Sequence, residues 1–140
     1  MFRLVLLLIG IISASLLPTA YAIDPLDRLQ VTSPRLEDFA GNTIEQSIIV
    51  NQLVLITADI TNNQDVPQNF VYIIQIKDSQ NIIRYISSFS AEIDSNKTFS
   101  PALSWTPNTA GKFVAEIYVW ESLNNPDPLS ESLSLSMTAS

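Results

Sequence analysis

The 140-residue chain contains neither cysteine nor histidine. Without cysteine it forms no disulfide and offers no thiolate for zinc, for an iron–sulfur cluster or for nucleophilic catalysis. Without histidine it lacks the imidazole that blue-copper sites, His-ligated zinc and Ser-His-Asp or Cys-His catalytic groups require. Together these two absences exclude much of enzyme and metal chemistry.

Basic residues are also few. Lys and Arg total 7 against 14 Asp and Glu, which gives a formal net charge of −7. A chain with this balance repels nucleic-acid phosphates and anionic membrane surfaces, so we expect no nucleic-acid partner. Hydrophobic residues make up 46% of the chain, enough for one domain to close a core without cross-links.

A long apolar run occurs only at the N-terminus. A short basic lead ending at Arg3 precedes an almost unbroken apolar run over 4–17, and then come Pro18 and the small-residue pattern Ala20-Tyr21-Ala22. This order predicts a helical secretory signal peptide over 1–22, cleaved after Ala22. The alternative is an uncleaved membrane anchor, because the run approaches the length that spans a bilayer. In both cases we expect the rest of the chain to work outside the cytoplasm, either secreted or at the cell surface.

After a lead-in over 23–30, short alternating segments are separated by turn sequences. Strands are predicted over 29–36, 53–61, 70–77, 82–89, 98–105, 112–121 and 129–138. Pro34 is expected at an edge or a bulge of the first strand. About seven short strands without lasting helical periodicity predict an all-β fold, an immunoglobulin-like Greek-key sandwich over 31–140. Its strands are assigned in chain order to positions A to G.

One corner of this sandwich carries a resemblance. The segment SWTPNTAGKF, from Ser104 to Phe113, resembles the W-x-P…A-G-x-Y/F signature that joins strands E and F in many prokaryotic extracellular immunoglobulin-like modules. These modules include adhesion-type domains of archaeal and bacterial surface proteins. The resemblance implies a binding or structural role, with no catalysis and no cofactor.

Strand parity separates inward from outward residues. In the strand over 112–121, the residues at odd positions from Phe113 to Val119 are all apolar, Ile117 among them, and are predicted to face the core. Phe99, Leu103 and Trp105 share one parity and are expected to anchor the core together with Phe113 and Ile117. The even positions of the strand over 112–121 then point outward.

Positions C and F are neighbours in one immunoglobulin sheet, so their outward residues should form one surface. The predicted members are Val71, Ile73, Val114, Tyr118 and Trp120. We expect them to contact an envelope protein or glycan, or a second copy of the chain. Two alternatives remain: the lead-in folds over this surface, or the aromatic residues serve only as cross-strand pairs. A structural role in the envelope without a discrete ligand is a further alternative.

Acidic loop residues are expected to converge at one end of the sandwich. They are Asp24, Asp27, Asp65 and Asp127. Oxygen-rich clusters suit Ca²⁺, but the spacing matches no defined calcium loop, and Asp and Asn are common turn formers. We therefore expect no metal site.

Two further motifs are a pair of adjacent acids and a glycosylation sequon. Glu37 and Asp38 are adjacent, so their side chains point to opposite faces of a strand, which excludes the carboxylate pair of a glycosidase. Asn96 begins the only N-x-S/T sequon and falls in a predicted surface turn. It is the candidate glycosylation site of a secreted chain.

Overall fold

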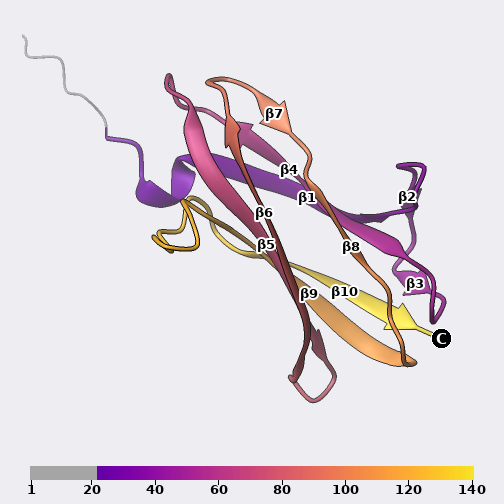
Figure 1. Cartoon of the computed structure of the whole chain (residues 1–140). Coiled ribbons are helices and arrows are strands. Elements are labelled where there is room, and N and C mark those ends of the chain that lie inside the picture. Colours follow the sequence, from indigo (N-terminus) through magenta and orange to yellow (C-terminus); the bar gives the residue numbers. More distant parts are fainter. Residues whose placement is uncertain (1–21) are drawn as a thin grey trace, which may run out of the picture.

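A computed structural model describes residues 22–140 (Figure 1). The predicted signal peptide, apart from Ala22, lies outside the described residues. The described chain is all-β apart from one short 3-10 helix, η1 (Pro25–Asp27). It contains no helix with the length and hydrophobicity of a membrane span.

Two sheets pack face to face. The first contains β1 (Leu29–Glu37), β2 (Thr43–Ile44), β4 (Val54–Asn62), β7 (Thr98–Phe99) and β8 (Ala102–Trp105). The second contains, in order across the sheet, β3 (Ser47–Ile48), β10 (Leu133–Ala139), β9 (Gly111–Trp120), β5 (Gln68–Asp78) and β6 (Ile83–Ile93). All pairings are antiparallel except that of β3 with β10. The predicted immunoglobulin-like β-sandwich is confirmed.

The core lies between the sheets and follows the alternation of the sequence. On β4 the buried inward residues are Val54, Ile56, Ala58 and Ile60, and on β9 they are Phe113, Ala115, Ile117 and Val119. These rows stay inward because a strand turns successive side chains to opposite faces. The predicted facing of the strand over 112–121 is confirmed.

The strand predicted over 82–89 at position D lies in the other sheet. It is β6, which pairs with β5 and extends to Ile93. The reason is the short turn after β5: the N–H of Asp78 donates to the carbonyl of Ile82 at 3.0 Å, so the chain folds back beside β5. A turn this tight makes a hairpin and cannot reach a sheet about 10 Å away.

Prolines shape two strands of the first sheet. The expected bulge at Pro34 is confirmed by a shift of register between Thr32 and Arg35 in the pairing of β1 with β4, with Ser33 at φ 55°. The single strand predicted over 98–105 is divided into β7 and β8 around Pro101. Proline lacks the N–H that a continuous ladder needs, so both pieces pair with β4 but not as one strand.

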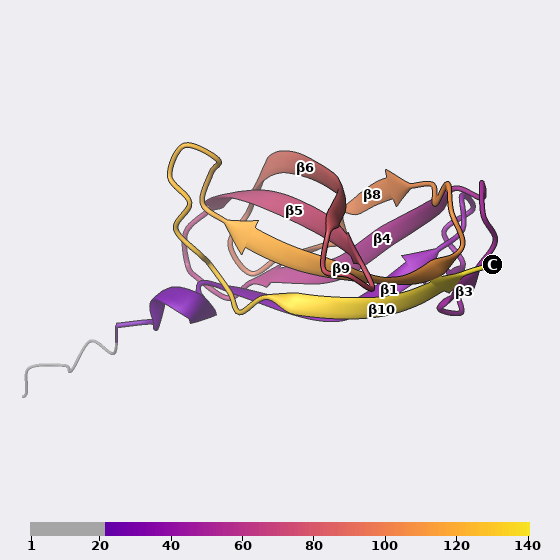
Figure 2. The same cartoon turned by 90° about the horizontal axis from the view of Figure 1, so that it is seen from below.

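Other boundaries differ at the ends of elements. β1 begins at Leu29 as predicted for the first strand, so this core residue belongs to the sandwich and not to the lead-in, but β1 ends at Glu37 instead of 36 and β10 begins at Leu133 instead of 129. The two-residue strands β2 and β3 were not predicted, because two residues show no alternation. η1 lies at one end of the sandwich and the C-terminus at the other (Figures 1 and 2). The lead-in therefore does not lie across the outer face of β5 and β9.

Candidate interaction surface

The outer face of the second sheet brings the five predicted surface residues together. Four rows of residues cross β6, β5 and β9 in register, namely Ser90-Val71-Trp120, Ser88-Ile73-Tyr118, Ile86-Gln75-Glu116 and Ile83-Lys77-Val114. We call these twelve residues the outer patch. The pairing of β5 with β9 that the sequence predicted is confirmed, since Val71 lies opposite Trp120.

Two members of the outer patch are buried, contrary to prediction. Val71 is 0% exposed and Ile73 is 7% exposed, although neither belongs to the core between the sheets. Each lies directly opposite a large ring of β9, Trp120 for Val71 and Tyr118 for Ile73. Large cross-strand neighbours cover short aliphatic side chains on the same face. Val71 and Ile73 therefore form the floor of the patch, and the half-buried rings form its surface.

The aromatic pair is held in a fixed arrangement. The ring centroids of Tyr118 and Trp120 lie 5.8 Å apart with an interplanar angle of 51°. The hydroxyl of Tyr118 donates a hydrogen bond to Oε2 of Glu116 at 2.8 Å. Tilted aromatic pairs at this separation are favourable, and the hydroxyl bond orients the tyrosine ring.

Glu116 is the polar centre of the patch. Nε2 of Gln75 donates to its Oε2 at 2.8 Å, and Nζ of Lys77 lies 3.1 Å from the same oxygen. Burial alone would raise the pKa of Glu116, but the hydrogen bonds from Tyr118, Lys77 and Gln75 outweigh it and lower the pKa. Burial and the bond to this carboxylate raise the pKa of Tyr118. The carboxylate is thus ionised and matched by a cation.

Sequence reasoning missed the contribution of β6. Ile86 is 57% exposed on this face, beside Gln75, and Ser88 and Ser90 line the edge next to Ile73 and Val71. The alternation of Ile86, Ser88 and Ser90 was visible in the sequence. It was not assigned to this surface because position D of an immunoglobulin domain belongs to the opposite sheet.

The outer face of the first sheet is different in character. The guanidinium of Arg35 bonds Oε1 of Glu37 at 2.7 Å and Oδ1 of Asp59 at 3.0 Å. Ser100 donates to the same Asp59 oxygen at 2.7 Å, and this bond is the main cause of the lowered pKa of Asp59. A face built from charged pairs is a solvated face, so the aromatic contact surface lies on the second sheet.

The excluded carboxylate pair has structural roles. Glu37 pairs with Arg35, whereas Asp38 accepts hydrogen bonds from the backbone N–H groups of Ala40 and Asn42. Hydrogen bonds from Asn42 are the main reason that the pKa of Asp38 is lowered. The two carboxylates therefore stabilise a strand and the turn after it.

Of the predicted core anchors, one is misplaced. Trp105, Phe113 and Ile117 are buried, and Leu103 is half-buried against the core. Phe99 is 41% exposed. It ends the short strand β7 at the sheet edge, where its ring stacks on Phe89 with centroids 6.1 Å apart. Its ring centroid also lies 6.3 Å from that of the buried Phe70, so Phe99 packs at the margin of the core.

The acidic loop residues do not gather into a metal-binding group. Within residues 22–140 no three acidic side chains lie close enough to hold a metal ion. Asp127 pairs with Arg28, with Nη2 and Oδ2 2.7 Å apart, and Asp24 caps η1 through the N–H of Leu26. Asp27 lies near Asn63 in a surface groove, and Asp65 is exposed in the loop after β4.

The two processing positions are accessible in the fold. Asn96 is exposed in the turn between β6 and β7 at φ 58°, and Ala22 is exposed before η1. Glycosylation and cleavage at these positions stay predictions.

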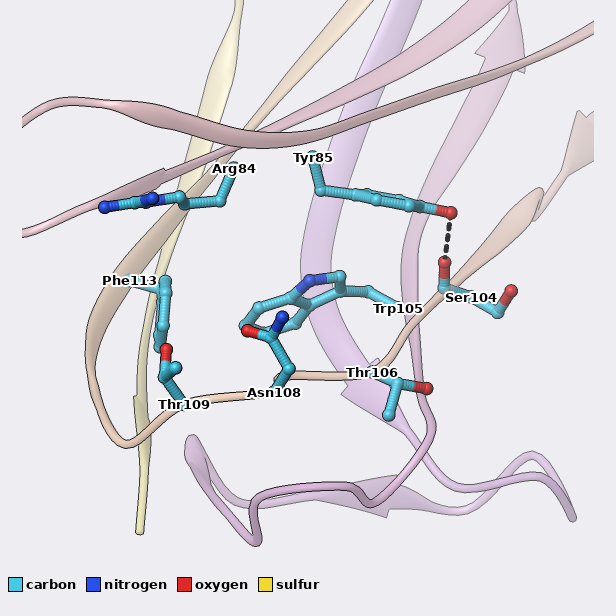
Figure 3. A pocket seen from close by; sticks show the side chains of 8 residues that line it. All are labelled: Arg84, Tyr85, Ser104, Trp105, Thr106, Asn108, Thr109 and Phe113. Carbon is cyan, nitrogen blue, oxygen red and sulfur yellow. Dashed lines mark hydrogen bonds between the residues drawn. The ribbon is translucent and has the colours of Figure 1, made fainter.

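A cavity of about 620 Å³ opens where β6, β8 and the loop before β9 meet (Figure 3). Its lining residues are Arg84, Tyr85, Ser104, Trp105, Thr106, Asn108, Thr109 and Phe113. The hydroxyl of Tyr85 donates to the carbonyl of Ser104 at 3.0 Å, which ties β6 to β8. We call this feature the Trp105 cavity. It was not predicted because it requires β6 to lie beside β8.

The fold and the surface together define an immunoglobulin-like β-sandwich domain. No protein-family model matches the chain, and no curated protein is detectably similar to it in sequence. Solved structures are similar in fold. The C-terminal domain of Wzt matches with a TM-score of 0.68 and 11% identity, over 81% of this chain and 74% of that one.

Two further structures show the same fold in different settings. The CARDB domain of a Pyrococcus furiosus protein, solved in complex with di-metal ions, matches with a TM-score of 0.57 and 12% identity over 85% of this chain and 95% of that domain. A cycloisomaltooligosaccharide glucanotransferase of Paenibacillus sp., complexed with cycloisomaltoheptaose, matches with a TM-score of 0.62 and 17% identity. That match covers 79% of this chain and 14% of the enzyme.

Proposed function

We propose that the sandwich is a non-catalytic binding module that works outside the cytoplasm and contacts an envelope protein through the outer patch. The observation that carries this proposal is the Tyr118–Trp120 pair. Both rings remain half-buried on a floor of Val71 and Ile73, which the fold does not need for its main core. Tyrosine and tryptophan on a preformed surface are the residues that most often dominate protein interfaces.

The electrostatics of the outer patch support contact with a protein surface. Burying an unpaired charge in an interface is costly, but Glu116 is already matched by Lys77 and by hydrogen bonds from Tyr118 and Gln75. A partner can cover this carboxylate without leaving it unpaired. The centre of the patch therefore carries a compensated ion pair and no unpaired charge that an interface would have to bury.

A protein is favoured over a glycan because of the aliphatic side chains around the rings. Ile86 and Ile83 are exposed on the β6 side of the patch, and Val114 is half-exposed on its β9 side. Aliphatic groups gain from burial against apolar protein surface. A glycan is covered with hydroxyl groups and offers much less apolar surface to bury.

The test compares capture of a partner from envelope extracts by the wild-type chain, by Trp120→Ala and Tyr118→Ala, and by Phe39→Ala. Phe39 is the matched control because it is an aromatic residue 88% exposed in the turn after β1, a strand of the first sheet, whereas the patch lies on the second. We expect one protein to be retained by the wild type and Phe39→Ala and lost with either patch variant. If capture persists after proteolysis of the extract but is lost after oxidation of its sugars, the partner is a glycan and not a protein. Equal capture by all four chains contradicts the proposal.

A second candidate function is a structural element of the envelope that assembles with copies of itself. The edge of β6 favours it: β6 pairs with β5 on one side only, and it exposes Ile83, Ile86 and Phe89. Long edge strands with exposed apolar residues pair with other strands, whereas a lysine on the edge opposes this. Concentration-dependent sedimentation of the wild type that is abolished by Ile86→Lys would support self-assembly. A monomer at all concentrations would contradict it.

A further inference from the structure

We propose that the Trp105 cavity binds one neutral sugar residue, at a site separate from the outer patch. The cavity combines aromatic walls with the polar side chains of Ser104, Thr106, Asn108 and Thr109. This combination recognises a ring that has apolar C–H faces and hydroxyl groups around its edge. Its volume of about 620 Å³ lies within the range of small-molecule sites, roughly 300 to 1,000 Å³.

The apolar walls come from three rings on different elements. Trp105 ends β8 and Phe113 lies in β9, with their centroids 5.1 Å apart at an interplanar angle of 69°. Tyr85 of β6 closes the side opposite Trp105 in Figure 3. Its ring is held by the bond from its hydroxyl to the carbonyl of Ser104. The walls are therefore preorganised, which reduces the entropy cost of binding.

The indole nitrogen of Trp105 is the most informative polar group. The residue is only 6% exposed, but its Nε1–H is open to the cavity, because Oγ1 of Thr57 is the only fully buried side-chain nitrogen or oxygen without a partner within residues 22–140. Figure 3 shows the nitrogen edge of the ring turned toward the space below Arg84 and Tyr85. A solvent-reached N–H that lines a cavity can exchange its water for an acceptor on a ligand. A sugar hydroxyl in the cavity would supply that acceptor.

Other donors and acceptors surround the opening. The side chains of Thr106, Asn108 and Thr109 come from the loop after β8, and the hydroxyl of Ser104 comes from β8 itself. Each can both donate and accept, as a sugar hydroxyl does. The loop is held by a hydrogen bond from the backbone N–H of Asn51 to the carbonyl of Pro107 at 2.8 Å. Gly111, at φ 150°, allows the chain to turn into β9.

The charge of the cavity argues for a neutral ligand. Arg84 is the only charged residue among its lining residues, and its Nη2 lies 2.6 Å from Oδ2 of Asp78. The backbone N–H of Ile82 and the guanidinium of Arg84 lower the pKa of Asp78, so this carboxylate stays ionised beside the arginine. The pair leaves no net positive charge for an acidic sugar. Arg84 still has N–H groups to donate to a hydroxyl.

The chain contains two tryptophans, one in the cavity and the other in the outer patch. Trp105 reports on the cavity and Trp120 reports on the outer patch. Their indole N–H signals in an NMR spectrum of the isotope-labelled chain can be assigned with Trp120→Phe, which removes one of them. Binding at the cavity and binding at the outer patch are therefore distinguishable in one spectrum, and either proposal can fail alone.

The experiment titrates the chain with glucose, N-acetylglucosamine and glucuronate. We expect a neutral sugar to shift the Trp105 indole signal, to leave the Trp120 signal in place, and to bind more tightly than glucuronate. Asn108→Ala should weaken the binding by about fivefold to tenfold, the effect of losing one hydrogen bond. The matched control is Asn124→Ala, because Asn124 is an exposed asparagine in the loop after β9, away from the cavity.

Three results would overturn the proposal. The Trp105 signal could stay unchanged with both neutral sugars, or Asn108→Ala and Asn124→Ala could bind equally well. Tighter binding of glucuronate would show that the Arg84–Asp78 pair opens to receive an acidic ligand, which contradicts the neutral assignment. Because Asn108 is exposed in a loop, its replacement leaves the core intact, and an unchanged melting temperature verifies this.

Discussion

Trp120 lies directly opposite Val71 in the pairing of β9 with β5, and Val71 is fully buried although it faces away from the core. The indole of Trp120 therefore has two roles. Its inner side covers Val71, and its outer side contributes to the surface of the sheet. This relationship sets the expected behaviour of the patch residues.

Trp120→Ala should lower the free energy of unfolding by about 1 to 2 kcal/mol, because the ring is half-buried. Ile117→Ala, in the core, should cost more, about 2 to 5 kcal/mol. Denaturant unfolding of both variants measures the difference. A larger loss for Trp120→Ala than for Ile117→Ala would mean that the faces of β9 are reversed.

Glu116→Gln should destabilise the chain at neutral pH by up to about 1 kcal/mol, because it removes the ion pair with Lys77. The pKa of Glu116 is lowered in the fold, so its ionised form stabilises the fold above the ordinary carboxyl pKa of about 4.5. That contribution is lost as the pH falls through the lowered folded value, and the two chains should then converge. Unfolding measured across acid pH checks this, with the exposed Glu131→Gln as control. A difference that grows toward acid pH would contradict it.

Ca²⁺ at millimolar concentration should leave the melting temperature unchanged. A metal that bound the native state would raise it by linkage. Asp127 is already engaged with Arg28, and within residues 22–140 no three acidic side chains converge on one point. Thermal unfolding with Ca²⁺ and with chelator measures the effect. A rise that Asp65→Ala or Asp127→Ala removes would establish a site.

Export should produce a mature chain that begins at Ile23, because the apolar run over 4–17 ends in the Ala20-Tyr21-Ala22 pattern. N-terminal sequencing of the secreted protein checks the cleavage point. An intact Met1 in a membrane fraction would replace this prediction by the anchored alternative.

The sequence by itself determined the fold class and the facing of its clearest strands. Alternation from Phe113 to Val119 assigned one face of β9 to the core, and Pro34 marked the bulge in β1. These features are local, since the period of two in a strand and the missing N–H of proline act within a few residues.

Only the tertiary structure decided which outward residues are exposed and that β6 lies in the second sheet. Val71 and Ile73 are buried because Trp120 and Tyr118 lie opposite them, and β6 joins β5 because the turn after Asp78 is short. The Trp105 cavity follows from that placement of β6 beside β8. Burial on an outer face depends on the size of cross-strand neighbours, and a cavity depends on segments far apart in the chain. Neither is encoded in the alternation of a single strand.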